Sequence, residues 1–259
     1  MRRIIIAATA VVALVAAAVA YAQPANNTYT ATFSFNQKGS GTAKKPVPMG
    51  FTQVFNVTAG TSGDRAAPLT DIKVTLPNMK VNWKPFPTCS AAKIIVAKSD
   101  TICPKGALVA TGTITAELGD NTLTTPGTPC SPILDVWNAG GGKLNFFFVI
   151  SGVHQCGGLQ TGASAPYTGT ITPSGNGVIQ DTPLPPDVST DAGNIGAYGS
   201  LIYESLKWSK LTTKVNGTVV PFFESTGCPG GSRKVKVAFT ATDAQSVPLT
   251  GSATTAGKC

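Results

Sequence analysis

Apolar and polar side chains alternate along several short segments of this chain, and this period of two is the strongest constraint on its fold. In residues 29–36, every second side chain from Tyr29 to Phe35 is apolar, which is typical of a strand buried on one face. The run 144–150 contains three consecutive phenylalanines and predicts a central strand buried on both faces. Further strands are predicted in the segments 51–57, 72–76, 108–118, 201–208 and 234–240.

The composition favours strands over helices. Helical surfaces are usually rich in Lys and Glu, but only three of the 259 residues are Glu and only 12% are charged. The abundant Thr and Val are residues that strands prefer. Helix is expected only in residues 91–98, with Ser90 as its N-cap, although three consecutive β-branched residues weaken it.

Turn and loop signals separate these strands. Asn216-Gly217 predicts a two-residue hairpin turn, because both residues tolerate positive φ angles. We therefore predict an all-β protein, an antiparallel β-sandwich of immunoglobulin-like or jelly-roll-like type, with at most one short helix. The segments rich in Gly, Pro, Thr and Ser that we interpret as loops are 119–132, 138–142, 157–166 and 173–200.

The N-terminus has the pattern of a secretory signal peptide. Arg2 and Arg3 precede an apolar run over residues 4–20, and Ala20-Tyr21-Ala22 forms a small-x-small cleavage site. An uncleaved membrane anchor is the alternative, but the run is at the short end of what spans a bilayer. We expect residues 1–22 to be removed, which lowers the formal charge from +8 to +6. The protein is then secreted or held at the cell envelope, without a transmembrane segment.

The expected mature chain, residues 23–259, is long enough to bury a hydrophobic core by itself. We predict one sandwich domain. The alternative is two β domains that divide near residues 119–130, where the chain reads as loop between two groups of strands.

Six cysteines follow the predicted leader, and export makes disulfides their expected use. Zinc sites normally contain close cysteine pairs, and here the cysteines are widely spaced and accompanied by one histidine. Six cysteines allow fifteen pairings, and sequence does not choose among them rigorously. Their order along the chain favours neighbours, namely Cys89–Cys103, Cys130–Cys156 and Cys228–Cys259.

The sequence nominates no catalytic, cofactor or metal site. His154 is the only histidine, no G-x-S-x-G motif accompanies it, and we interpret it as a surface or turn residue. Asp181, Asp187 and Asp191 match no calcium-loop spacing. The carboxylates considered for a sugar-cleaving pair are Glu117, Glu204, Glu224 and Asp135.

The three tryptophans are the candidates for a sugar-stacking surface. Trp137 precedes a Gly-rich loop and is the one most expected to be exposed, so it is our candidate ligand-binding residue. Trp208 ends an alternating strand and is expected in the core, while Trp83 fits either place. The partners that we consider are a cell-wall polymer, a glycan or a lipid; the scattered basic residues form no stripe of the kind that nucleic acid requires.

Two stretches carry a family resemblance. The first runs from Phe86-Pro87-Thr88-Cys89-Ser90 to Cys103-Pro104-Lys105-Gly106, and the second covers residues 221–240 and the final Cys259. Together they resemble a broad set of uncharacterised secreted proteins of actinobacteria, in which a Cys-Pro-x-Gly step leads into a strand. The Trp expected after the third Cys of that set is absent here. The resemblance implies a secreted β-rich protein and agrees with the first and last cysteine pairs, but it implies no activity.

We expect a non-enzymatic binding or structural protein of the cell surface. Three alternatives each make a structural prediction. A carbohydrate-binding module predicts exposed coplanar aromatic rings that include Trp137. A secreted hydrolase predicts a cleft that joins two carboxylates, or His154 to a serine. A lipid carrier predicts an apolar cavity between the sheets.

Overall fold

The structure is a computed structural model that describes residues 27–259, with side chains described for all of these except 159–161. The predicted leader, residues 1–22, lies outside the described residues. The strands are β1 (Thr28–Gln37), β2 (Val47–Thr58), β3 (Leu69–Leu76), β4 (Met79–Val81), β5 (Leu108–Gly119), β6 (Thr128–Cys130), β7 (Ile133–Gly140), β8 (Lys143–Cys156), β9 (Leu159–Ala163), β10 (Tyr167–Ser174), β11 (Gly177–Pro183), β12 (Tyr198–Trp208), β13 (Thr212–Val215), β14 (Thr218–Pro221), β15 (Phe223–Ser225), β16 (Ser232–Thr242) and β17 (Pro248–Lys258). The helix α1 spans Ala91–Ala97, and short 3-10 helices span Asp100–Ile102, Lys105–Ala107, Pro186–Val188 and Pro229–Gly231.

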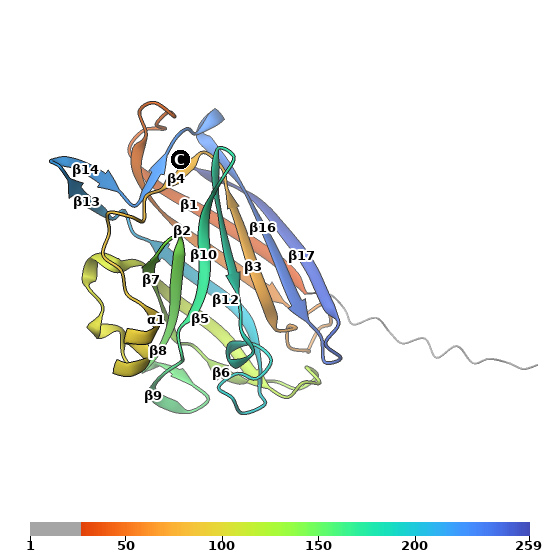
Figure 1. Cartoon of the computed structure of the whole chain (residues 1–259). Helices are drawn as coiled ribbons and strands as arrows, with labels where there is room; N and C mark the ends of the chain where they lie inside the picture. The colour runs from red at the N-terminus through yellow and green to blue at the C-terminus, as the bar shows by residue number, and fades with distance from the viewer. Residues whose placement is uncertain (1–26) are drawn as a thin grey trace, which may run out of the picture.

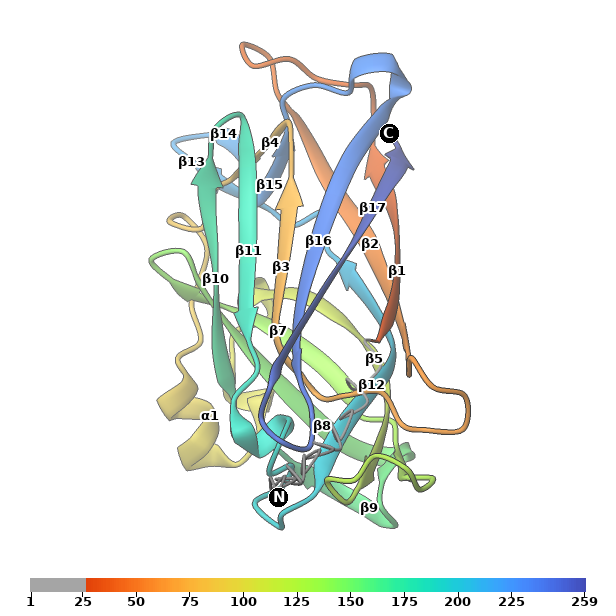
Figure 2. The ribbon, with the colours of Figure 1, turned by 90° about the vertical axis from the view of Figure 1, so that its right-hand side faces the viewer.

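One continuous antiparallel sheet forms the body of the protein (Figure 1). Its main path runs β1-β2-β12-β5-β7-β8-β10-β11-β3-β16-β17. The sheet folds over on itself, so that β17 at one end packs beside β1 at the other (Figure 2). The prediction of an all-β, sandwich-like antiparallel fold is confirmed.

Aromatic packing joins the two ends of this sheet. The ring of Tyr29 in β1 stacks on the ring of Phe239 in β16, with centroids 4.4 Å apart and planes 4° from parallel. Gly251 in β17 makes this contact possible, because a Cβ atom there would overlap the Tyr29 ring. The fold therefore places a residue without a side chain where the end strands come together.

The central strand β8 has buried side chains on both faces, as its apolar run predicts. Phe146 packs in the main core inside the folded sheet, and Phe147 packs in a second cluster beneath α1. Both side chains are buried. Because successive residues of a strand point to opposite faces, the consecutive phenylalanines serve two separate apolar clusters.

The two local predictions of helix and hairpin are confirmed. The Ser90 side chain accepts a hydrogen bond from the Lys93 backbone N–H and caps α1, whose residue Ile94 is fully buried. Asn216 and Gly217 have φ angles of 50° and 80° and join β13 to β14.

No helix in residues 27–259 has the length and the apolar character needed to cross a membrane.

The interpretation of residues 173–200 as a loop is wrong in part. They contain β11, which lies between β3 and β10 in the sheet. Gly177 allows the close approach, since a Cβ atom there would overlap the Leu76 carbonyl oxygen. The Gly and Pro residues that signalled a loop are tolerated because pairing on both edges compensates for their weak strand propensity. The predicted loops 119–132, 138–142 and 157–166 likewise contain β6, the end of β7, and β9. The strands β4, β7, β10, β15 and β17 were not predicted.

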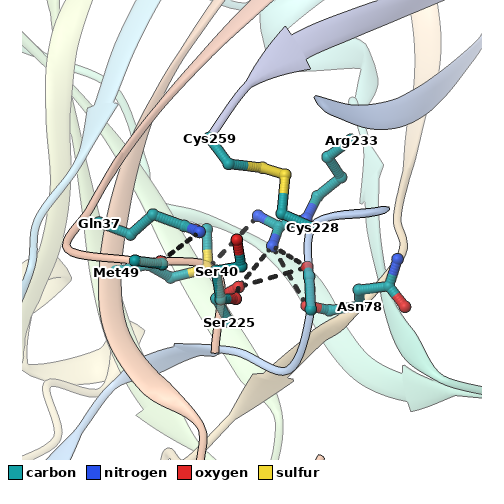
Figure 3. The surroundings of a disulfide bond; sticks show 10 residues. Gln37, Ser40, Met49, Asn78, Ser225, Cys228, Arg233 and Cys259 are labelled. Carbon is teal, nitrogen blue, oxygen red and sulfur yellow. Dashed lines mark hydrogen bonds between the residues drawn. A yellow bond between two sulfur atoms is a disulfide. The ribbon is translucent and has the colours of Figure 1, made fainter. Parts of the chain in front are cut away.

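Three disulfides join neighbours in the sequence, as their order predicts. They are Cys89–Cys103, Cys130–Cys156 and Cys228–Cys259, with Cα–Cα distances of 5.4, 3.8 and 6.4 Å. The last one joins Cys259, directly after β17, to Cys228, between β15 and β16, and the Arg233 side chain lies beside it (Figure 3). The strands β5 and β7, which flank the candidate boundary at 119–130, pair with each other in one sheet.

Candidate ligand-binding cavity

A cavity of about 650 Å³ lies inside the folded sheet, lined in part by residues of β6, β9 and the segment after β11. Its deep wall is made by fully buried side chains such as Phe55, while Ile195 at its rim is 76% exposed. The cavity therefore extends from the core toward the surface. Its larger apolar side chains are Phe55, Leu69, Ile72, Ile114, Leu118, Leu134, Phe146, Phe148, Ile150, Tyr167, Leu184, Val188, Ile195 and Leu201.

Strand periodicity directs one acidic side chain into this apolar space. Glu204, Leu206 and Trp208 alternate along β12 and all point inward. Leu206 and Trp208 belong to the core, whereas Glu204 lines the cavity. The strand thus carries a carboxyl group to a position where an apolar residue would ordinarily stand.

A single glutamine holds this carboxyl group in place. Gln53 in β2 donates from Nε2 to Oε1 of Glu204 at 2.7 Å, and its own Oε1 accepts from the Trp208 indole N–H at 3.0 Å. Because an indole nitrogen can only donate, Trp208 fixes the orientation of the Gln53 amide. The amide must then present its NH₂ group to Glu204.

Burial controls the ionisation of Glu204. Its side chain is 6% exposed, and loss of solvation raises its pKa to about 7, while the hydrogen bond from Gln53 opposes this rise. Burial also raises the pKa of Tyr167, and the negative charges of Glu204 and Asp187 add to that effect. The carboxyl group therefore titrates near neutrality inside an apolar cavity.

A second polar side chain enters the cavity from the opposite part of the sheet. Gln180 in β11 is 2% exposed and donates from Nε2 to the Thr182 hydroxyl at 3.2 Å. Its Oε1 atom is buried and has no hydrogen-bond partner among the described residues. Since a hydroxyl can donate or accept, reversing the amide would satisfy the oxygen and leave the NH₂ group unpartnered instead. One polar end of Gln180 thus remains available in either orientation.

The expectation that Trp137 is exposed is wrong. Its side chain is 5% exposed and packs with Ile94, Phe147 and the Cys89–Cys103 disulfide. Its indole N–H donates to Oδ2 of Asp100 at 3.2 Å. The disulfide-closed segment that carries α1 covers this face of β7, and the sequence pattern of the strand alone does not reveal that cover. Trp137 consequently offers no surface for stacking a sugar. Trp208 is in the core, as expected, and Trp83 is half-buried.

The other sequence candidates are dispersed. His154 lies near the end of β8, with Nδ1 3.1 Å from the Ser131 carbonyl oxygen. Asp135 lies beside Asp100 beneath the helical segment, and burial raises its pKa to about 6. Asp181 is in β11 and pairs with Lys73 at 3.0 Å. Within residues 27–259, no group of three or more acidic, histidine or cysteine side chains is arranged to hold a metal.

Sequence reasoning named Glu204 only as one of several carboxylates, although a specific signal was present. In the segment 201–208, Glu204 is in phase with the apolar Leu206 and with Trp208, which was expected in the core. A charged residue in phase with core residues must be buried, which is costly without a role or a partner. No such signal marks Gln180, because the strand that carries it was interpreted as loop.

No protein-family model matches this chain, and comparisons with curated proteins and with solved structures gave no match either.

Proposed function

We propose that this protein is a secreted or envelope-associated, non-enzymatic binding protein that holds a small apolar molecule in its cavity. The observation that carries this proposal is the cavity of about 650 Å³, with its mainly apolar wall and its few buried polar groups. Sites for small ligands have volumes of this order and the same mixture of lining groups. Of the roles considered from the sequence, a lipid carrier is the one that predicts such a space.

The proposed location rests on the leader and on the cysteines. Residues 1–22 have the charge and apolar pattern of an export signal. All six cysteines are paired in disulfides, and such bonds persist in oxidising compartments. A carrier outside the cytoplasm would shield an apolar molecule from water by enclosing it in the sheet.

Binding of an uncharged fluorophore tests the proposal. N-phenylnaphthylamine, which becomes bright in apolar surroundings, is titrated into the purified protein. We expect saturable binding, with loss of binding in Ala116→Trp, which fills the cavity from β5. Thr115→Trp is the matched control, because the neighbouring residue points to the other face of the same strand.

A second blocking variant, Leu118→Trp, lies on the same side of β5 as Ala116. It keeps the test informative if Ala116→Trp does not fold. Absence of binding to the folded wild-type protein would contradict the proposal. Equal binding by folded Thr115→Trp and Leu118→Trp would place the fluorophore elsewhere and would count against it as well.

A further inference from the structure

The charged residues in the cavity wall all have the same sign. Glu204 and Asp187 line the cavity, and its described wall contains no lysine, arginine or histidine. This contrasts with the whole chain, whose formal charge is +8. A ligand that enters this space meets carboxyl groups and no counter-ion for a negative charge.

Two polar atoms at the wall have capacity for a ligand. Among the described residues, Gln53 alone donates to Glu204, and it reaches only Oε1. A carboxylate can accept several hydrogen bonds, so Oε2 has capacity left. The buried Oε1 of Gln180 in the same wall is likewise unpartnered. Buried polar groups are normally satisfied, and a bound molecule with a donor group would satisfy Oε2 of Glu204.

We propose that the cavity takes an amphipathic molecule whose apolar body fills the space and whose single donor end, an amine or a hydroxyl group, lies against Glu204. This inference rests on the proposed function and narrows its ligand class. Glu204 is the recognition group, and Gln53 and Trp208 are positioning residues that keep its carboxyl group facing the cavity.

At pH values above the pKa of Glu204, the same geometry disfavours fatty acids and other carboxylates. A carboxylate head at this depth would lie beside Glu204, and two buried like charges without a counter-ion repel strongly. An ammonium head instead pairs with the Glu204 carboxylate, and a hydroxyl group donates to it. Ligands that share one apolar body and differ only in an amine, hydroxyl or carboxylate head group should therefore differ in affinity because of Glu204.

The pH dependence follows from the groups that face Glu204. Gln53 and Phe55 approach it from β2 and Ile114 from β5, while Tyr167 and Asp187 are the titratable groups of the facing wall. Tyr167 stays neutral at pH values around the pKa of Glu204, because its own pKa is raised. An alkylamine stays protonated over the same range. Its affinity should therefore rise with pH as Glu204 ionises, while the affinity of an alcohol changes less.

The test compares decylamine, decanol and decanoate as competitors of N-phenylnaphthylamine at pH 8, in wild type and in Glu204→Gln. The ratio between the two proteins is taken for each ligand, so that differences in lipophilicity cancel. We expect the variant to bind decylamine roughly 10- to 100-fold more weakly, which is the effect of losing a buried hydrogen bond to a charged group. The binding of decanol should be weakened less by the substitution, and decanoate should bind more tightly to the variant than to wild type.

Glu224→Gln is the matched control, because it removes a carboxylate from β15 that does not line the cavity. It should leave all three affinities unchanged. If the fluorophore binds but Glu204→Gln changes no ratio, or if decanoate competes as well as decylamine in wild type, the head-group inference is overturned and the proposed function stands. If the fluorophore does not bind to wild type, the proposed function itself fails.

Discussion

The guanidinium group of Arg233 lies over the ring of Phe35, with its central carbon 4.5 Å from the ring centroid. These residues come from β16 and β1, near the two ends of the sheet. Arg233 is 1% exposed, and Nη2 donates to Ser225 Oγ at 2.8 Å and to the Gly227 carbonyl at 2.9 Å (Figure 3). Burial lowers its pKa only to about 10, so the side chain remains charged at neutral pH.

Arg233→Met should lower the free energy of unfolding by about 2–4 kcal/mol, because it leaves buried acceptors without donors. The free energy of unfolding of Arg233→Lys should lie between those of wild type and Arg233→Met, because a lysine keeps a charged donor but lacks the planar fork of donors. Lys234→Met is the control, as the adjacent side chain is exposed, and it should change stability by less than about 0.5 kcal/mol. Urea denaturation measures all three, and equal stability of the Met variants would contradict the role assigned to Arg233.

Gly251→Ala tests the junction between β17 and β1. A methyl group at this position overlaps the ring of Tyr29, which cannot move away easily because it is stacked on Phe239. We expect a loss of about 1–3 kcal/mol, the usual effect of overpacking. Ser252→Ala changes the neighbouring exposed residue and should be nearly neutral. Thermal unfolding compares them, and a Gly251→Ala variant as stable as wild type would show that the strands are not in such close contact.

Glu204→Gln should alter the pH dependence of stability. Burial raises the pKa of Glu204 to about 7 in the folded state, against about 4.3 in an unfolded chain. The folded protein therefore holds this proton more tightly, and the wild-type free energy of unfolding falls as pH rises between these two values. The variant lacks this contribution, so the two proteins should be similar at pH 4 and the variant more stable by about 3 kcal/mol at pH 8.

Chemical denaturation across this pH range measures the difference between the two proteins. Asp71 and Asp135 also have pKa values raised to about 6, mainly by burial. These two groups make the free energy of unfolding fall with rising pH in both proteins, so their contribution cancels in the difference. A difference that stays constant with pH would contradict the buried, cavity-facing position of Glu204.

Removal of the first two disulfides should have similar energetic effects and different local ones. Cys130→Ala with Cys156→Ala, and Cys89→Ala with Cys103→Ala, open loops with sequence separations of 26 and 14, each worth about 3 kcal/mol in the chain-entropy estimate. Only the Cys89–Cys103 disulfide covers Trp137. Its removal should shift tryptophan emission to longer wavelength in the folded variant. An equal shift in both variants would contradict the covering role.

Local patterns in the sequence predicted much of the architecture. The alternation in residues 29–36, the Phe-rich run, the Ser90 cap and the Asn216-Gly217 turn each depend on neighbours in the chain, and all four agree with the structure. Such features are governed by side-chain periodicity and by backbone conformational preference. Pairing of sequential cysteines succeeded for a related reason, because each pair closes a short excursion of the chain.

The sequence by itself therefore determined the β class, the positions of many strands and the use of the cysteines, all of which follow from local preferences. Only the tertiary structure decided that β11 and β17 are strands, that Trp137 is covered by the segment of α1, and that Glu204 and Gln180 share one cavity. These outcomes depend on contacts between residues far apart in the chain. The alternation around Glu204 indicates that its side chain is buried, but the sequence around a single residue does not show which distant residues face it.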